Sequence, residues 1–593
     1  MRDDLESNVA MNKAGKRAGK RAGRAAVAGP RWRDPEFKYV YHPYIGFMLV
    51  LLMYTSFLFS EKYRLWAEDV TAETSGLKDS WLTPLLGRKI DAKDHQWKEF
   101  RNALPSIFGL VAASVILSRG FTGMLVAKGS KPGTPAFMFA RGYFYAALGA
   151  GFVYHLHGTM SIVVALIALG NFYMTRVFRE SKILPIFVWG YAIFAMFHPH
   201  KYDGYRWSHL PGFLGGGSSL AKWADGHRGA TRWHVLFNLF VLRMISYSMD
   251  HYWWWWRKPN GKDVVAKEKV NSSKSRIISH RPQAQYESLS TYFAYLFYPP
   301  CYLAGPTQTF NAFASHLERP QKSSFGKPML KLYFRFVASL LLFEVMQHYL
   351  YLNGITANLM STQGDVKPGM TMIDTISDDG TDAFSILCYS FMALVFIWFK
   401  FLLIWRLARC WAMMDGIDVP ENMRRCMLNN YTISGFWKGW HASYNRWLIR
   451  YLFIPLGGSR VGMLRQIGNI FVVFTFVAVW HDRSMQLLSW GWLFVLFMAA
   501  ELMGKKVGSI MFRGSEGDTS SWRHAVAFVG TINISALLFT NLIGFAYSIE
   551  GMKKVIRVMD AYDVFGVSLF LVFFYVAVHW MQEWRRQERL SLS

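Results

Sequence analysis

The chain has 593 residues, of which 52% are hydrophobic, 17% aromatic and only 18% charged, and its 66 Lys and Arg against 39 Asp and Glu give a net charge of +27. A soluble domain carries about 25% charged residues, whereas several apolar blocks here are long enough to cross a bilayer core of about 30 Å. The composition therefore excludes a soluble enzyme, a disordered chain and a small secreted domain. It predicts a multi-pass membrane protein with many aromatic rings at the membrane interfaces.

Residues 1–43 begin the chain as a basic tail, which we expect in the cytosol. Residues 1–35 are polar and rich in Lys and Arg, interleaved with Ala and Gly, and no apolar stretch of signal-peptide type lies among them. We therefore expect no cleavage here. A solvated tail is the simpler interpretation, and contact with anionic lipid is the alternative.

Twelve apolar segments follow, and each is predicted to be a membrane-spanning helix. Together they define a single multi-span domain over residues 44–581, followed by a short C-terminal tail at 582–593. The segments lie at 44–60, 105–126, 136–153, 158–175, 183–198, 231–249, 328–351, 383–405, 463–480, 486–503, 523–547 and 562–581.

Two further apolar pieces, 289–305 and 449–458, are short and interrupted by Pro and Gly. Backbone that is not helical persists at membrane depth only where protein or a water-filled cavity satisfies its polar groups. Both pieces are therefore predicted to be re-entrant segments that line an internal space.

The charge of the connecting loops predicts their sides of the membrane. The loop at 250–288 is strongly basic and should be cytosolic, whereas the loop at 352–382 carries five Asp and one Lys and should face the lumen. With both termini in the cytosol, the segment 61–104 becomes a second lumenal loop. The same reasoning accounts for the net positive charge without nucleic acid, because Lys and Arg lie in short runs between apolar blocks.

Two histidines stand out because a histidine within or beside a span is costly unless it is paired or functional. His441 lies in the string FWKGWHASYNRW, just before the re-entrant piece at 449–458, and His481 ends a nearly uncharged apolar run in VWHD. A neutral imidazole can take a proton from a hydroxyl near neutral pH, as acyl transfer requires. If residues 441–447 are helical, Asn445 lies on the same face as His441.

No metal site is predicted. The two histidines lack a third close ligand in the sequence, and the four cysteines show no CxxC pairing. Small buried residues are the simpler interpretation of those cysteines.

The string FWKGWHASYNRWLIRYLFIPLGG, followed by VWHD, closely resembles the signature of the membrane-bound O-acyltransferase (MBOAT) family. YPPCYLAGPTQTFNAF at 298–313 and FNLFVLRMISYSMDHYW at 237–253 extend the resemblance. The family implies an all-α polytopic fold, here with about 12 transmembrane helices plus re-entrant segments around a tunnel. It also implies an acyl-CoA-dependent O-acyltransferase.

Within the family, the VWHD context, the ISHRP loop and RMISYSMDHYW most resemble the branch of fungal acyltransferases associated with glycerol uptake and GPI-anchor remodelling. Hedgehog acyltransferases, more distant in the same branch, carry an Asp-type partner upstream in place of the Trp-His pair. His441 therefore favours the remodelling branch or the bacterial relatives that acetylate alginate and teichoic acid. In sterol and diacylglycerol acyltransferases the position of His441 is typically Asn, which makes a neutral-lipid storage enzyme a poorer match. The resemblance therefore implies a lyso-GPI acceptor, on a protein or as a lysolipid.

The resemblance implies roles for the catalytic candidates. His481 would act as general base on the acceptor hydroxyl, and His441 with Asn445 would position the thioester or stabilise the developing oxyanion. Asp482 is adjacent to His481, but neighbouring helical side chains diverge, so a structural role is the simpler expectation.

Long-chain acyl-CoA is the expected co-substrate, with no permanently bound cofactor. Its phosphates need basic residues on the cytosolic side. The candidates nearest the motif are Lys438, Arg446 and Arg450, together with the aromatic Trp440. For the three cations an equal alternative is that they only orient the membrane spans.

Other functions stay open at this stage. They are acylation of a secreted protein or another lipid, polyol or glycerol transport, and a catalytically silent regulator. A transporter would show interrupted helices in matching halves of the chain, and 289–305 and 449–458 lack matching flanks. The endoplasmic reticulum membrane is the expected location by resemblance, with the plasma membrane as the alternative.

Overall fold

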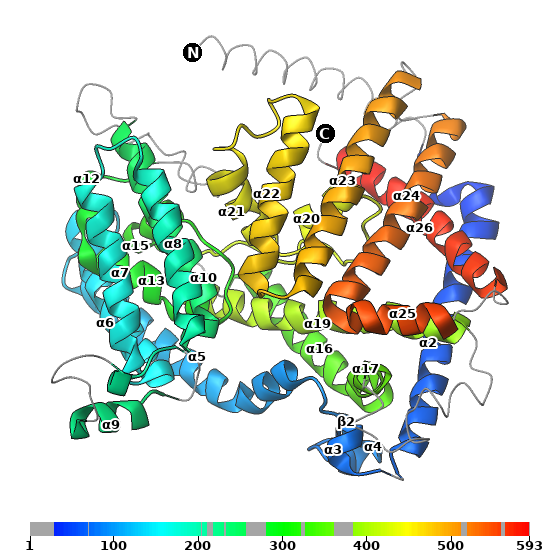
Figure 1. The fold of residues 1–593 in the computed structure, drawn as a ribbon, viewed down its shortest axis with the longest axis horizontal. Helices are drawn as coiled ribbons and strands as arrows, with labels where there is room; N and C mark the ends of the chain where they lie inside the picture. Colours follow the sequence, from blue (N-terminus) through cyan, green and yellow to red (C-terminus); the bar gives the residue numbers. More distant parts are fainter. Residues whose placement is uncertain are drawn as a thin grey trace.

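The computed structural model describes residues 29–591 except 69, 203, 210–217, 230–232, 257–279, 322–325, 361–382, 512–518 and 559–563. The described chain is almost entirely helical (Figure 1). Its only sheet is a two-residue antiparallel pairing of β1 (Leu77–Lys78) with β2 (Ile90–Asp91). The all-α class expected from the apolar blocks is therefore confirmed for this part of the chain.

Long helices make up the body of the protein. In the first half they are α2 (His42–Trp66), α5 (His95–Ala127), α6 (Pro135–His157), α7 (Met160–Val177), α8 (Leu184–Lys201) and α10 (Trp233–Trp256). In the second half they are α16 (Lys327–Tyr349), α19 (Ala383–Met414), α22 (Met463–His481), α23 (Met485–Met511), α24 (Ser520–Asn541) and α26 (Val564–Leu590). A π-helical segment, η6 (Leu542–Tyr547), and α25 (Ser548–Val558) continue α24.

Each of the twelve predicted spans falls on one of these helices, but the described residues contain nine helices that are long and apolar enough to cross a membrane. The other three are α8, α10 and α16. Their apolar character is diluted by polar residues, for example by Arg243 and Asp250 in α10, which are buried inside the protein. Burial against protein replaces contact with lipid for these side chains, so a helix can be central and still fall short in hydropathy.

The helices form two groups joined by α19 (Figure 1). In the first group, α13 (Leu289–Phe297) packs on α6 and α10 and is hydrogen-bonded to α7, and α8 packs on α7 and α10. Gly149 of α6 allows a very close approach to α13, because a Cβ there would lie 2.7 Å from the carbonyl oxygen of Phe297. In the second group, α22 packs on α23 and α24 packs on α26.

The two predicted re-entrant pieces are short broken helices. Residues 289–305 form α13 and α14 (Pro299–Leu303), which meet at Tyr298, and both helices are largely buried. Residues 449–458 begin as a π-helical segment, η5 (Ile449–Phe453), and continue as turns. Both pieces lie in the same buried hydrophobic cluster as α10 and α22.

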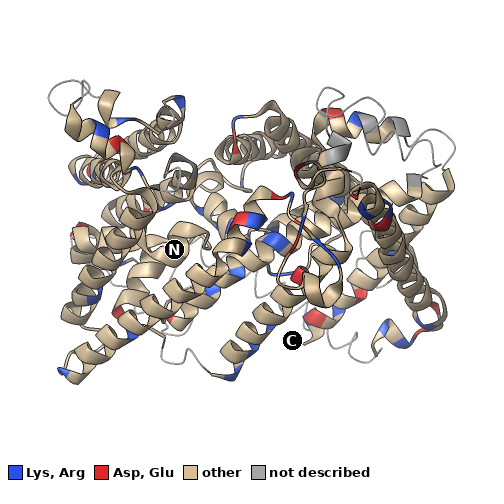
Figure 2. Ribbon diagram, turned by 90° about the horizontal axis from the view of Figure 1, so that it is seen from below, with Lys and Arg blue, Asp and Glu red and all other residues tan. Residues whose placement is uncertain are grey.

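The ends of the predicted loops differ from expectation. The N-terminal tail becomes helical before residue 44, since η2 (Phe37–Tyr41) leads directly into α2. The loop predicted at 61–104 is shorter, because α2 continues to Trp66 and α5 begins at His95. Most of the loops predicted at 250–288 and 352–382 lies outside the described residues. Charged residues are sparse on the long helices and gather mainly at helix ends and connections (Figure 2).

Within the segment between α2 and α5, Asp91 joins the β-pair to the chain that follows α16. One carboxylate oxygen accepts the backbone N–H of Lys93 at 3.0 Å, and the other accepts those of Asn353 and Gly354 at 2.7 and 3.1 Å. The carboxylate is 3% exposed. This small subdomain is therefore fixed to the body by a buried acid.

Candidate active site

His441 lies at a sharp turn between two short helices, α20 (Ile433–Gly439) and α21 (Ala442–Leu448). Its backbone is left-handed, with φ 40° and ψ 47°, a conformation that costs a residue with a Cβ roughly 1–2 kcal/mol. Its carbonyl accepts the backbone N–H of Asn445 at 3.0 Å, so the first turn of α21 begins at the histidine itself. Strain of this kind persists only where the surroundings hold it.

The loop before α20 supplies that hold. Asn422 is buried, and its carbonyl accepts the backbone N–H of Ala442 at 2.9 Å while its side-chain oxygen accepts that of Ser443 at 3.1 Å. The Ser443 hydroxyl in turn accepts the backbone N–H of Thr307 at 2.8 Å. The Trp-His turn and the Pro-Gly segment at 298–313, which the sequence placed apart, are thus joined directly.

Aromatic rings enclose the His441 imidazole. Trp405 of α19 stacks on it, with ring centroids 4.4 Å apart and planes 19° apart, and the ring of Tyr444 lies 5.0 Å away. The side chain is 6% exposed, and its Nε2 is buried without a hydrogen-bond partner in the part of the chain that the structure describes. A buried unpaired nitrogen is costly, so it is suited to a bond that forms only with substrate.

His481 has the opposite environment. It is the last residue of α22, and its side chain is exposed. Its imidazole is edged by the rings of Trp480, Trp490 and Phe545 at centroid distances of 4.8, 6.0 and 5.9 Å. The helix therefore ends by presenting a histidine that a substrate can reach.

Trp480 connects the two histidines. The centroid of its ring lies 6.3 Å from that of His441 and 4.8 Å from that of His481. Reciprocal hydrogen bonds fix it to α10: its indole N–H donates to the Asn238 carbonyl at 2.9 Å, and the Asn238 amide donates to the Trp480 carbonyl at 2.7 Å. The spacing of the two histidines thus depends on the packing of α22 against α10.

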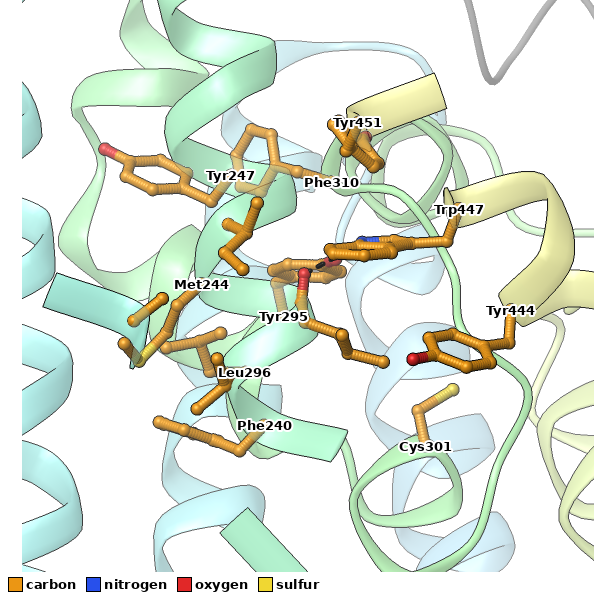
Figure 3. Packing of buried hydrophobic residues seen from close by; sticks show 14 of the residues in the cluster. Phe240, Met244, Tyr247, Tyr295, Leu296, Cys301, Phe310, Tyr444, Trp447 and Tyr451 are labelled. Atoms are coloured by element: carbon orange, nitrogen blue, oxygen red, sulfur yellow. Dashed lines mark hydrogen bonds between the residues drawn. The ribbon is translucent and has the colours of Figure 1, made fainter. Parts of the chain in front are cut away.

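Tyr444 contributes another ring to the aromatic cluster formed by Trp405, His441 and Trp480. Its ring lies 4.5 Å from that of Trp480, and its hydroxyl is buried without a partner among the described residues. Figure 3 shows Tyr444 and Trp447 projecting from α21 toward the segment that carries Cys301 and Tyr295. A second unsatisfied polar group therefore lies beside His441.

The remaining candidates, Asn445 and Asp482, form no side-chain hydrogen bond with either histidine in the described chain. Asn445 is half-buried, and its side chain forms no hydrogen bond with another described residue; its link to His441 is through the backbone. Asp482 is exposed, and its carboxylate accepts the backbone N–H of Arg483 at 2.7 Å. No hydrogen bond joins it to His481 in the described chain.

The four residues expected to bind CoA separate into different environments. Trp440 stacks on Phe436 and lies 5.9 Å from Trp405, next to the histidines. The guanidinium of Arg446 bonds the Ala442 carbonyl at 3.2 Å, and Arg424 and Arg409 are close enough to act on it electrostatically. Lys438 lines a separate polar cavity.

Arg450 faces the other way. It forms a 2.8 Å ion pair with Asp250, which is fully buried, and lies over the ring of Trp253 at 4.9 Å. The hydroxyl of Tyr451 donates to the same carboxylate at 3.0 Å. The charge of Arg450 is therefore already matched within the protein.

Sequence reasoning did not identify Trp405, Asn422 or Tyr444 as parts of this site. Trp405 is 36 residues before His441 on a helix with no polar pattern of its own, and only packing brings the rings together. Tyr444 lies inside the signature string, so the string could have indicated it. Among the described residues no group of three or more His, Cys, Asp or Glu could hold a metal ion, and the four cysteines are free thiols.

The chain is similar to known proteins over most of its length. Residues 219–549 match the model of the MBOAT, membrane-bound O-acyltransferase family. The chain is 32% identical to the membrane-bound O-acyltransferase GUP1 of Saccharomyces cerevisiae over 577 residues, covering 94% of this chain and 92% of that protein. It is 32% identical to gup1 of Schizosaccharomyces pombe over 495 residues, 81% of this chain and 76% of that one. The mouse protein-cysteine N-palmitoyltransferase HHAT is 25% identical over 199 residues, 33% of this chain and 36% of its own.

Proposed function

Because this chain belongs to the membrane-bound O-acyltransferase family and is therefore an acyl-transfer enzyme, we propose that it moves a long fatty acyl chain from acyl-CoA to a lipid-linked hydroxyl. The proposed acceptor is a lyso-GPI anchor, free or on a protein, in the endoplasmic reticulum membrane. The acceptor rests on the resemblance of the signature strings to the GPI-remodelling branch. Similarity to the GUP1 proteins over nearly the whole chain supports the same branch.

The observation that carries the proposal is the pair of unlike histidines whose rings both contact the ring of Trp480. One, His441, is buried with an unpaired Nε2, and the other, His481, is exposed at the end of its helix. A two-substrate transfer needs both kinds of group. A fixed donor can hold the thioester carbonyl, and a reachable base can meet the incoming hydroxyl.

The proposed step is direct transfer. His481 takes the proton of the acceptor hydroxyl, and the oxygen attacks the carbonyl carbon of the thioester. The resulting oxyanion accepts a hydrogen bond from His441 Nε2–H, the tautomer that this role requires. The C–S bond then breaks, and the CoA sulfur leaves with the proton that His481 carries. The products are the acylated lipid and free CoA, so atoms and charges balance.

For the CoA head, we propose Trp440 and Arg446 as the contacts nearest the reaction centre. Arg409 is close enough to Arg446 to act on it electrostatically, and the two guanidinium groups give this side of the site the positive potential that phosphates need. Asn445, one residue before Arg446, is proposed to orient the thioester from the same helical turn. Arg450 has a structural role in this scheme, since Asp250 already matches its charge.

The test is acyl transfer in membranes that express the full chain, supplied with radiolabelled acyl-CoA and a lyso-GPI acceptor. His481→Ala should lower the rate about 10²–10⁴-fold. The control is His95→Ala, because His95 is an exposed histidine that forms an ion pair with the exposed side chain of Glu99. Both variants are compared at equal protein level.

The outcomes separate the alternatives. Label entering GPI in the wild type and in His95→Ala, but not in His481→Ala, supports the proposal. CoA release that depends on His481, with label in another lipid or in a peptide, retains the enzyme and replaces the acceptor. Absence of His481-dependent thioester consumption would contradict the proposed chemistry and favour the transporter or regulator alternatives.

A further inference from the structure

An apolar cavity of about 310 Å³ lies away from the two histidines, among α2, α19, α24 and α26. Its lining includes Leu49, Leu394, Leu538 and Phe573, one from each helix. Leu49 is 43% exposed and Trp584, at another edge of the cavity, is 49% exposed. Both belong to helices that qualify as membrane spans, so the cavity borders on the lipid side of the protein.

A second cavity of about 460 Å³ adjoins the first, and Asn430 lines both. Its character is reversed. The charged residues that line it are Arg424, Arg425, Lys438, Arg585 and Glu588, which sum to a charge of +3.

The basic charges of this second cavity are only partly matched. Glu588 forms an ion pair with Arg425 at 2.7 Å and lies 3.8 Å from Arg585. In the described chain, the side chains of Arg424 and Lys438 have no hydrogen-bond or ion-pair partner. Arg424 and Lys438 are exposed to solvent, so their charges carry no burial cost, but a cluster with a net charge of +3 beside an apolar cavity attracts an anion.

We propose that the two cavities together bind one anionic glycerophospholipid of the membrane. Its phosphate would lie among Arg424, Lys438 and Arg585, and one of its acyl chains would fill the apolar cavity. The combined shape fits an amphiphile because a polar and an apolar compartment meet at a single residue. Their volumes lie in the range of about 300–1,000 Å³ typical of small-molecule sites.

The position of the cavities favours a resident lipid over acyl-CoA. Neither cavity is lined by His441 or His481. Phe436 forms the wall of the apolar cavity toward the histidines, and its ring stacks on that of Trp440 at 5.8 Å. An acyl chain lying behind this aromatic layer would be held apart from the histidines. The inference does not depend on the proposed acceptor or on catalysis.

The experiment uses the full-length protein purified in a non-ionic detergent. Retained lipids are extracted and quantified by mass spectrometry, and the melting temperature is measured with added phosphatidylserine or with phosphatidylcholine of the same chains. Wild type should retain about one anionic phospholipid per chain and should be stabilised by phosphatidylserine more than by phosphatidylcholine. His481→Ala should behave identically, which separates this inference from the proposed function.

Two variants address the two compartments. Arg424→Glu should weaken retention about tenfold, because it removes one favourable charge and adds an opposing one. Ala577→Leu should reduce retention by filling the apolar cavity, which Ala577 lines. The matched controls are Arg424→Lys, Ala577→Ser and Arg460→Glu, the last at an exposed arginine outside both cavities.

The proposal is overturned if the wild type retains no phospholipid, if the two phospholipids stabilise it equally, or if acyl-CoA is retained in the phospholipid's place. Retention in Arg424→Glu and Ala577→Leu equal to that of their controls would also overturn it. Should a variant fail to fold, as judged by size-exclusion chromatography, the comparison of phosphatidylserine with phosphatidylcholine on wild type still decides.

Discussion

Trp405 stacks on His441 with ring centroids 4.4 Å apart and planes within 19° of parallel. The contact joins the C-terminal half of α19 to the turn between α20 and α21, and it fixes the plane of the imidazole. Stacked aromatic pairs contribute about 0.5–1.5 kcal/mol beyond the area that they bury. We expect Trp405→Ala to lower kcat about tenfold with little change in KM for the acceptor, and Trp405→Phe to retain most of the activity.

The control for that prediction is Trp492→Ala, which removes an indole that is 40% exposed and packs on Phe471 away from the histidines. Steady-state kinetics in membranes is the measurement. Equal loss in the Phe and Ala variants of Trp405 would show that the stack does not position His441.

The left-handed backbone of His441 predicts an unusual order of stability. Both His441→Ala and His441→Gly remove the imidazole and should reduce activity to a similar low level. Only glycine adopts φ 40° without steric cost, so the Gly variant should be more stable than the Ala variant by about 1 kcal/mol. Melting temperatures of the two purified variants give the comparison. A more stable Ala variant would mean that the turn relaxes once the histidine is gone.

Tyr444→Phe separates a structural role from a substrate contact. The hydroxyl is buried without a partner in the described structure, so its removal should leave the unliganded protein equally or more stable. If the hydroxyl bonds substrate, the same variant should lose about five- to tenfold in kcat/KM, the cost of one net hydrogen bond. Unchanged kinetics with a raised melting temperature would assign the hydroxyl no part in the reaction.

Arg446 and Arg450 should respond differently to the same change. Arg446→Gln should raise KM for acyl-CoA. Added salt should raise this KM more in the wild type than in the variant, because salt screens the charge that the variant lacks. Arg450→Gln leaves the buried carboxylate of Asp250 without its ion-pair partner, which typically costs about 3–5 kcal/mol, so the yield of folded protein should fall. Asp250→Asn in the same chain should restore part of that yield. A rise in KM for acyl-CoA in folded Arg450→Gln would return this arginine to the CoA site.

Asp91 predicts a pH dependence of stability. Burial raises the pKa of Asp91 from the ordinary 3.8 of an aspartate to about 6, and its three backbone N–H donors offset this only in part. The folded state therefore holds its proton longer than the unfolded state, so stability should fall as pH rises from about 4 to about 6, by up to about 3 kcal/mol, and then level off. Melting temperatures of wild type and Asp91→Asn across this range give the test. Parallel curves would contradict it.

The helices were predictable because a long apolar stretch is a local property of the sequence. Where the structure describes them, the twelve expected segments lie on helices, and nine of these helices are long and apolar enough to cross a membrane. For α10 the lower hydropathy reflects Asp250 and Arg243, whose burial is visible only once α10 is packed against its neighbours.

The candidate site shows the same limit. The histidines could be found from the words around them, but the left-handed turn, the Trp405 stack and the support from Asn422 depend on contacts between distant segments. Lys438 illustrates the consequence. It lies three residues from His441 in sequence, yet its side chain lines a cavity that contains neither histidine.

The ion pair between Asp250 and Arg450 also bears on how the protein is made. The two residues are 200 positions apart in the chain. At roughly 5–20 residues per second, α10 emerges from the ribosome roughly 10–40 s before its partner. During that interval the carboxylate of Asp250 has no cation from α21 or η5 to neutralise it. Until Arg450 is made, this acid must therefore be held protonated or in contact with water. An arrest in synthesis between the two residues should yield a chain that the membrane retains poorly.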